Sequence, residues 1–180
     1  KYDPTLALEL QVILEELVSA GKIRWYGWST DTIDSARKFA SSVNSTHCTA
    51  IQFRLNAIHD NPEMRKVCAE FDLAGINKDP LNKGFLTGKF NTNTTFPEND
   101  NRSDWDFSQP ELQNRLSIID ELREILTSNG RTMAQGAVGP LSPVRRHRPR
   151  HILVLLSDRS DVVQYLLGVL ADGPAGNPPS

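Results

Sequence analysis

The sequence predicts an α/β fold in which parallel strands alternate with helices. Three short apolar segments, 23–29, 48–53 and 73–77, are separated by stretches with helical periodicity. Strands separated by helices of about 10 to 15 residues are typical of parallel βαβ units. Because such sheets bind ligands at the carboxyl ends of their strands, we expect a functional site at that edge.

The first elements are a helix and a strand. Leucine, isoleucine and valine recur at helical spacing over 5–20, and Gly21 suits the position just past the helix end. Residues 23–29 (IRWYGWS) are too few for a stable helix and rich in aromatic side chains, so we predict a strand that is buried on both faces. Asp31 is the predicted N-cap of a second helix over 32–42.

The same alternation continues in the next segment. Residues 48–53 (CTAIQF) read as a second strand. Asn61 then offers a cap and Pro62 a first helical position, which opens a helix with an apolar face. Residues 73–77 (LAGIN) are the third predicted strand.

The second half of the chain begins with a long polar connector. Residues 91–110 are helix-poor, and their length favours either a functional lid or a disordered segment. Leucine and isoleucine spacing over 112–126 predicts a helix that ends near Asn129 and Gly130. Thr132 is expected to cap another helix, which glycines and prolines stop within two turns.

The composition changes abruptly after the short helix. Residues 139–151 (GPLSPVRRHRPRH) replace an apolar face with helix breakers and a basic run, as a shifted reading frame or an altered splice would produce. We predict a strand at 152–156, a helix capped by Ser160, and a disordered tail at 172–180.

Composition and charge exclude several classes of partner. With 20 Lys and Arg against 22 Asp and Glu, the net charge of -2 creates no field for nucleic acid or an anionic membrane. The basic run 144–151 lacks aromatic interleaving, which favours a solvated loop over a localisation signal or a nucleic-acid patch. Cys48 and Cys68 fit neither a disulfide framework nor a zinc site, so a reduced, cytoplasmic setting is expected. No apolar run approaches the roughly 18 residues of a membrane span.

Three motifs in order resemble the C-terminal half of an aldo-keto reductase. They are LEELVSAGKIRWYGWST (14–30), AIQFRLN (50–56) and GINKDPLNKGFLTGKF (75–90). The resemblance implies a partial (β/α)8 TIM barrel over 1–138, with approximately strands 5 to 8 and their helices, followed by a divergent region over 139–180.

The resemblance also implies NADP(H) as the cofactor. Ser29 and Thr30 end the first strand, and Gln52 lies in the second, at places where the family holds the nicotinamide carboxamide. A primary amide suits this task, because it both donates to and accepts from another amide. The alternative is that Ser29 and Thr30 cap the next helix and that Gln52 is a satisfied buried amide.

The loop after the third strand stands where the family binds the pyrophosphate. Glycines permit close backbone approach, and a lysine and a hydroxyl complement phosphate, so the loop fits an anion even without the resemblance. A solvated turn is the alternative. Asp79 departs from the usual serine, and its carboxylate would repel a pyrophosphate. The resemblance implies that Lys78 stands where the family places a large side chain against the nicotinamide face. The turn and glycine-rich stretch that follow it hold Asp79, Pro80, Leu81, Gly84, Thr87, Gly88 and Lys89.

Three further residues stand at cofactor positions of the family. Arg102, on the long connector, would close over the pyrophosphate, with a solvated side chain as the alternative. Ser160 and Gln164 stand where the family contacts the adenosine end.

No residue of the chain is expected to be catalytic. The family's Tyr, Lys, Asp and His come from its first four strands, and Tyr26 and His47 lie outside the matching motif. The resemblance therefore implies an oxidoreductase of small aldehydes and ketones, of which this chain is a fragment that is inactive alone. The alternative is a non-catalytic nucleotide-binding or regulatory module. Unpaired barrel edges invite self-association.

Overall fold

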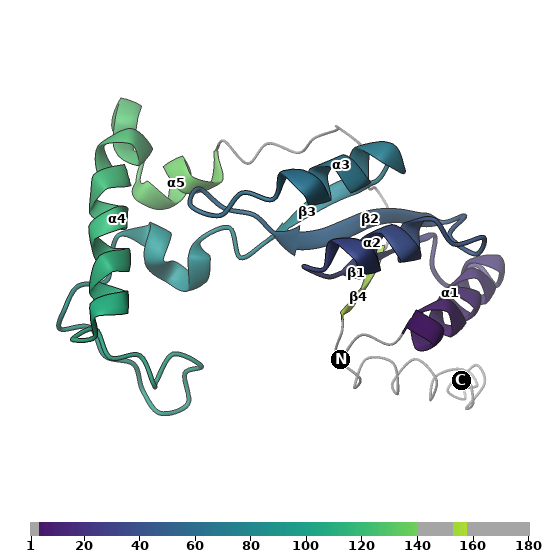
Figure 1. Ribbon diagram of the computed structural model, residues 1–180, viewed down its shortest axis with the longest axis horizontal. Helices are drawn as coiled ribbons and strands as arrows, with labels where there is room; N and C mark the ends of the chain where they lie inside the picture. The colour runs from purple at the N-terminus through teal and green to yellow at the C-terminus, as the bar shows by residue number, and fades with distance from the viewer. Residues whose placement is uncertain (1–3, 140–152, 158–180) are drawn as a thin grey trace, which may run out of the picture. The chain divides into compact units, whose positions relative to one another are not determined.

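The computed structural model describes residues 4–139 and 153–157 of the 180-residue chain (Figure 1). The described residues form two compact units, and the second is largely inserted in the sequence of the first. The first unit holds 4–53, 62–76 and 153–157, and the second holds 54–61 and 77–139.

The first unit is built on a four-stranded sheet. Its strands are β1 (Trp25–Ser29), β2 (Cys48–Arg54), β3 (Ala74–Lys78) and β4 (Leu153–Ser157). Their order is β3-β2-β1-β4, and β1 runs parallel to both β2 and β4. All four predicted strands are confirmed. The last strand lies beside β1 and not beside β3, so the order along the sheet departs from the order along the chain.

Three helices accompany this sheet (Figure 1). They are α1 (Pro4–Ser19), α2 (Ile33–Ala40) and α3 (Pro62–Glu70). Helix α2 packs against both α1 and α3. The strands and helices bury large apolar side chains between them, including Leu14, Tyr26, Phe39, Ile51, Phe53 and Met64. This core fixes the positions at which the strands end.

The helix ends show one correct and one wrong prediction. Gly21 has a left-handed φ of 67° just past α1, as predicted. Asp31 is not the N-cap of α2, because that position belongs to Thr32. The Thr32 side chain makes no capping hydrogen bond, and instead its backbone N donates to Oγ1 of Thr30 at 3.1 Å. The start of α2 is thus held by a hydroxyl from the end of β1.

The second unit is built from helices and an aromatic core. Its elements are the 3-10 helices η1 (Asn82–Thr87) and η2 (Ser128–Gly130) and the helices α4 (Pro110–Thr127) and α5 (Met133–Val138). The connector 91–110 has a defined path and is no loose segment, because Phe96, Trp105 and Phe107 pack with Phe85 and Phe90.

The short helix α5 has the expected cap and an additional packing constraint. Thr132 and Gln135 form a reciprocal capping box, which confirms the predicted start. Gly136 lies inside α5, where an added Cβ would come within 1.9 Å of the Leu126 carbonyl oxygen. This glycine therefore allows α5 to approach α4 closely, and Gly139 follows as the C-cap.

None of the helices within 4–139 is long and apolar enough to cross a membrane. The predicted helix after Ser160, the basic run 144–151 and the tail 172–180 lie outside the described residues.

Candidate functional site

The predicted carboxamide site lies at the carboxyl ends of β1 and β2. Ser29 and Gln52 are direct partners across the parallel strands, and the backbone N of Thr30 donates to the Gln52 carbonyl at 2.9 Å. Ser29 and Thr30 are buried, and Gln52 is half-buried. The structure therefore brings these three residues together in the first unit.

The predicted phosphate loop follows β3 and belongs to the second unit. We call residues 79–89 the cradle loop. Its backbone turns sharply, since Asp79, Asn82 and Lys83 have φ values of 60°, 49° and 52° and Gly84 has 101°. Successive left-handed residues direct backbone N–H groups to one side, which suits anions.

Packing explains part of the glycine and hydroxyl pattern of the cradle loop. Gly88 has a left-handed φ of 67°, and a Cβ there would lie 2.2 Å from Sδ of Met133, so a larger residue would have to displace the Met133 side chain. Thr87 Oγ1 donates to the Gly84 carbonyl at 2.6 Å. Leu81 packs on the aromatic core, and Lys89 is exposed. Only some of the predicted loop contacts therefore present polar atoms to a ligand.

Asp79 is held within the cradle loop by several contacts. Its Oδ1 accepts a hydrogen bond from the Lys83 backbone N, and its Oδ2 lies 3.6 Å from Nε of Arg54. Its carbonyl oxygen accepts from the Asn82 backbone N at 3.0 Å and from Nδ2 of Asn56 at 3.1 Å. The carboxylate thus faces a backbone donor and a guanidinium.

Arg102 reaches the cradle loop from the connector. Its Nη1 donates to the Lys83 carbonyl at 3.1 Å, and its Nε and Nη2 donate to Asp100 at 2.9 and 2.7 Å. The guanidinium also lies 4.2 Å from the centre of the Phe96 ring. The hydrogen bonds between these two side chains lower the pKa of Asp100 and raise the pKa of Arg102. Arg102 is therefore anchored beside the loop.

A cavity of about 460 Å³ adjoins the cradle loop within the second unit. Lys83 lies on its wall with its Nζ 5.9 Å from the centre of the Trp105 ring. Arg54 also lines it and donates from Nη2 to Oδ1 of Asn82 at 2.8 Å. The other lining residues are Asp104, Asp106, Gln109, Glu111, Leu112 and Arg115.

Sequence reasoning missed the residues that line this cavity. The position of Arg54, two residues after Gln52 at the end of β2, was an available signal, since alternate residues of a strand point to the same face. Trp105 and Arg115 carried no such signal, because the path of the connector and of α4 brings them to the cavity.

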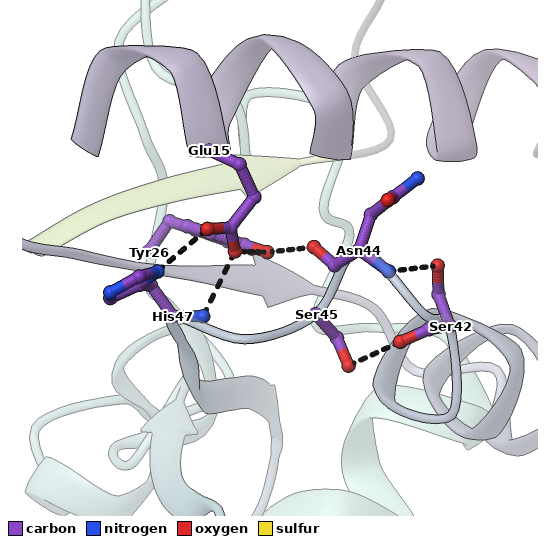
Figure 2. Close-up of polar contacts among 6 residues, drawn as sticks. All are labelled: Glu15, Tyr26, Ser42, Asn44, Ser45 and His47. Atoms are coloured by element: carbon purple, nitrogen blue, oxygen red, sulfur yellow. Dashed lines mark hydrogen bonds and ion pairs between the residues drawn. The ribbon is translucent and has the colours of Figure 1, made fainter. Parts of the chain in front are cut away.

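A second polar cluster lies at the opposite, amino ends of the strands (Figure 2). The Tyr26 hydroxyl, with its single proton, lies between two acceptors, Oε1 of Glu15 at 2.8 Å and the Asn44 carbonyl at 2.7 Å. Nδ1 of His47 lies 2.6 Å from Oε2 of Glu15, and the His47 backbone N donates to Oε1 at 2.9 Å. This cluster connects α1 to β1 and β2.

The Glu15 cluster has perturbed acidities with structural causes. Burial, followed by the hydrogen bond with Glu15, raises the pKa of Tyr26. Burial alone would raise the pKa of Glu15, but hydrogen bonds from His47 and Tyr26 outweigh it and lower this pKa. Tyr26 is thus a poor proton donor near neutral pH, and its position agrees with a packing role.

The other reactive side chains offer little chemistry. Burial raises the pKa of Cys48 to about 12 and that of Cys68 to about 11, so both thiols stay protonated. In the part of the chain that the structure describes, no group of three His, Cys, Asp or Glu side chains could hold a metal ion. Ser160 and Gln164, predicted at the adenosine end, lie outside the described residues.

Comparisons with known proteins bear on the family and the fold of the chain. The aldo-keto reductase yakc [NADP(+)] of Schizosaccharomyces pombe is 30% identical over 125 residues, which cover 68% of this chain and 37% of that protein. The solved structure of a glycerol dehydrogenase from Gluconobacter oxydans superposes with a TM-score of 0.66 at 22% identity, over the whole of this chain and 59% of that chain. The fold is therefore α/β and a partial barrel of this type.

The match covers most of this chain but only part of its relative. The chain spans little more than a third of its Schizosaccharomyces pombe relative. The model of the Aldo/keto reductase family matches residues 2–139, which include both strand ends and the cradle loop. The chain therefore belongs to the aldo/keto reductase family.

Proposed function

We propose that the chain forms the cofactor-holding part of an NADP(H)-dependent oxidoreductase of small aldehydes and ketones. Three polar residues at adjoining strand ends support this proposal: Ser29, Thr30 and Gln52. Their hydroxyl and amide groups supply the donors and acceptors that a nicotinamide carboxamide needs. The name of the Schizosaccharomyces pombe relative also points to NADP(+).

The fit to the cofactor differs between its two ends. At the nicotinamide end, Gln52 would orient the carboxamide and Ser29 would hydrogen-bond to it, so that the reacting face is fixed. Bound NADP(H) would supply the hydride for carbonyl reduction. At the phosphate end, the Arg102 guanidinium lies beside the cradle loop but is paired with Asp100, and Asp79 places a carboxylate in the loop.

We further propose that the chain alone does not catalyse turnover. Carbonyl reduction needs a proton donor within hydrogen-bond reach of the carbonyl oxygen. Among the described residues, Tyr26 and His47 are engaged with Glu15 at the amino ends of the strands, opposite the carboxamide site. The same observation favours a second candidate, a non-catalytic nucleotide-binding module.

A fluorescence titration of the full chain with NADPH tests the binding proposal. We expect saturable binding that weakens up to about tenfold in Gln52→Ala, because one or two hydrogen bonds to the ligand are lost. Gln113→Ala, at an exposed position of α4, is the matched control and should bind as the parent chain does.

Two outcomes decide the proposal. Absence of a saturable signal at high micromolar NADPH would remove the cofactor-holding role. Measurable oxidation of NADPH by an added aromatic aldehyde, above the rate without protein, would contradict the absence of turnover and exclude the non-catalytic module.

A further inference from the structure

We infer that Asp79 acts as an internal anion that opposes the binding of a phosphate group in the cradle loop. The inference rests on the proposed function, since it concerns the same loop. It assigns Asp79 a role in setting ligand affinity.

The carboxylate of Asp79 already hydrogen-bonds to one group that an anion would use and lies at ion-pair distance from a second. Oδ1 accepts from the Lys83 backbone N at 2.5 Å, and Oδ2 faces Nε of Arg54 at 3.6 Å. A phosphate oxygen is recognised by the same two kinds of partner, a backbone N–H and a guanidinium. The Asp79 carboxylate oxygens therefore occupy the positions that phosphate oxygens would take.

The backbone keeps this carboxylate in position. Asp79, Asn82 and Lys83 all have left-handed φ values, and the Asp79 carbonyl is held by Asn82 N and Asn56 Nδ2. Only 21% of the Asp79 side chain is exposed. Swinging the carboxylate out would break its contacts with Lys83 and Arg54, so an incoming phosphate meets a fixed negative charge.

The consequence is electrostatic competition. A phosphate that enters the loop must displace Asp79 from Lys83 N or accept a like charge within a few ångströms in a partly dry site, and either lowers affinity. Salt screens such repulsion, so the effect must shrink as ionic strength rises. A residue with a purely structural role would show no such salt dependence.

Asp79→Asn is the sharpest variant for a test. Asparagine tolerates the left-handed conformation and keeps an oxygen that can accept from Lys83 N. It removes the charge and replaces the oxygen that faces Arg54 by an amide NH2 group. Asp79→Ser removes the carboxylate altogether. Asp34→Asn, at an exposed position of α2, is the control for the change in net charge.

The affinity for NADPH is measured by fluorescence titration of the full chain at low and at high salt. We expect both Asp79 variants to bind at least tenfold more tightly than the parent chain at low salt, with a smaller difference at high salt and no change for Asp34→Asn. Inorganic pyrophosphate gives a second readout: it should raise the Tm of both Asp79 variants more than that of the parent chain.

The outcomes separate the two proposals. Equal affinity of the parent chain and a folded Asp79→Asn for both probes overturns the role of Asp79 and leaves the cofactor-holding function intact. Absence of saturable binding in every chain, the Asp79 variants included, overturns both. A tighter Asp79→Asn whose advantage is independent of salt overturns the competition of charges.

Discussion

Glu15 joins three segments of the first unit through its two carboxylate oxygens. It accepts from the Tyr26 hydroxyl and from the His47 backbone N, and it contacts the His47 ring. The residue types were visible in the sequence, but their meeting was not, because Glu15 lies on α1 and His47 precedes β2. Likewise, the sequence placed Ser29 and Gln52 at strand ends, whereas the contact of Asp79 with Lys83 depends on a left-handed turn.

The acidity of Glu15 makes the stability of the chain depend on pH. Because its pKa is lower in the folded chain than the ordinary 4.5, the ionised carboxylate stabilises the fold above that value. This stabilisation is lost as the pH falls through the lower, folded value. We expect Glu15→Gln to reduce the free energy of unfolding at neutral pH and to flatten its decline below about pH 4.5.

Urea unfolding at a series of pH values measures this effect. Glu9→Gln, an exposed glutamate on the same helix, serves as the control and should keep the parent pH dependence. A Glu15→Gln profile that runs parallel to that of the parent chain would refute the assigned role.

The helices and strands were predictable where periodicity and end signals agreed. Gly21, Pro62 and the Thr132 capping box marked helix ends correctly. Asp31 did not cap α2. Instead, the Thr30 hydroxyl accepts from the Thr32 backbone N, a local contact between residues two apart that agrees with the alternative role of Thr30 at the start of the next helix. The connector 91–110 was ambiguous because its aromatic side chains find partners only in the folded unit.

The contact between α4 and α5 gives a prediction at this scale. Gly136→Ala should destabilise the second unit by more than about 2 kcal/mol, because the new Cβ would clash with the Leu126 carbonyl oxygen. Gly130→Ala is the matched control: nothing lies within 4 Å of its Cβ, and only its left-handed φ of 72° adds strain, for which we expect about 1 kcal/mol. Equal losses of stability in thermal unfolding would show that the close approach is unimportant.

The part of the chain that the structure describes forms two units with separate cores. The first is centred on residues such as Leu14 and Ile51, and the second on the cluster around Phe85 and Phe107. The alternation of elements indicated the α/β class and the motifs indicated the family. The division into two units was not visible in the sequence, because β2 and β3 each contribute residues to both units.

Hydrogen exchange can show whether the two cores respond independently. We expect Glu15→Gln to reduce amide protection in β1 and β2 while leaving α4 unchanged, and Gly136→Ala to do the reverse, because each change acts on one core. A uniform loss of protection across both units in either variant would indicate a single cooperative unit.

The pairing of β1 with β4 joins Trp25 to Leu153 across most of the described chain. During synthesis on the ribosome, β1 emerges well before β4, its partner on that edge. Until then, the backbone N–H and C=O groups along this edge are open to strands of other nascent chains. Chaperone binding to the growing polypeptide should therefore persist until Leu153–Ser157 has left the exit tunnel.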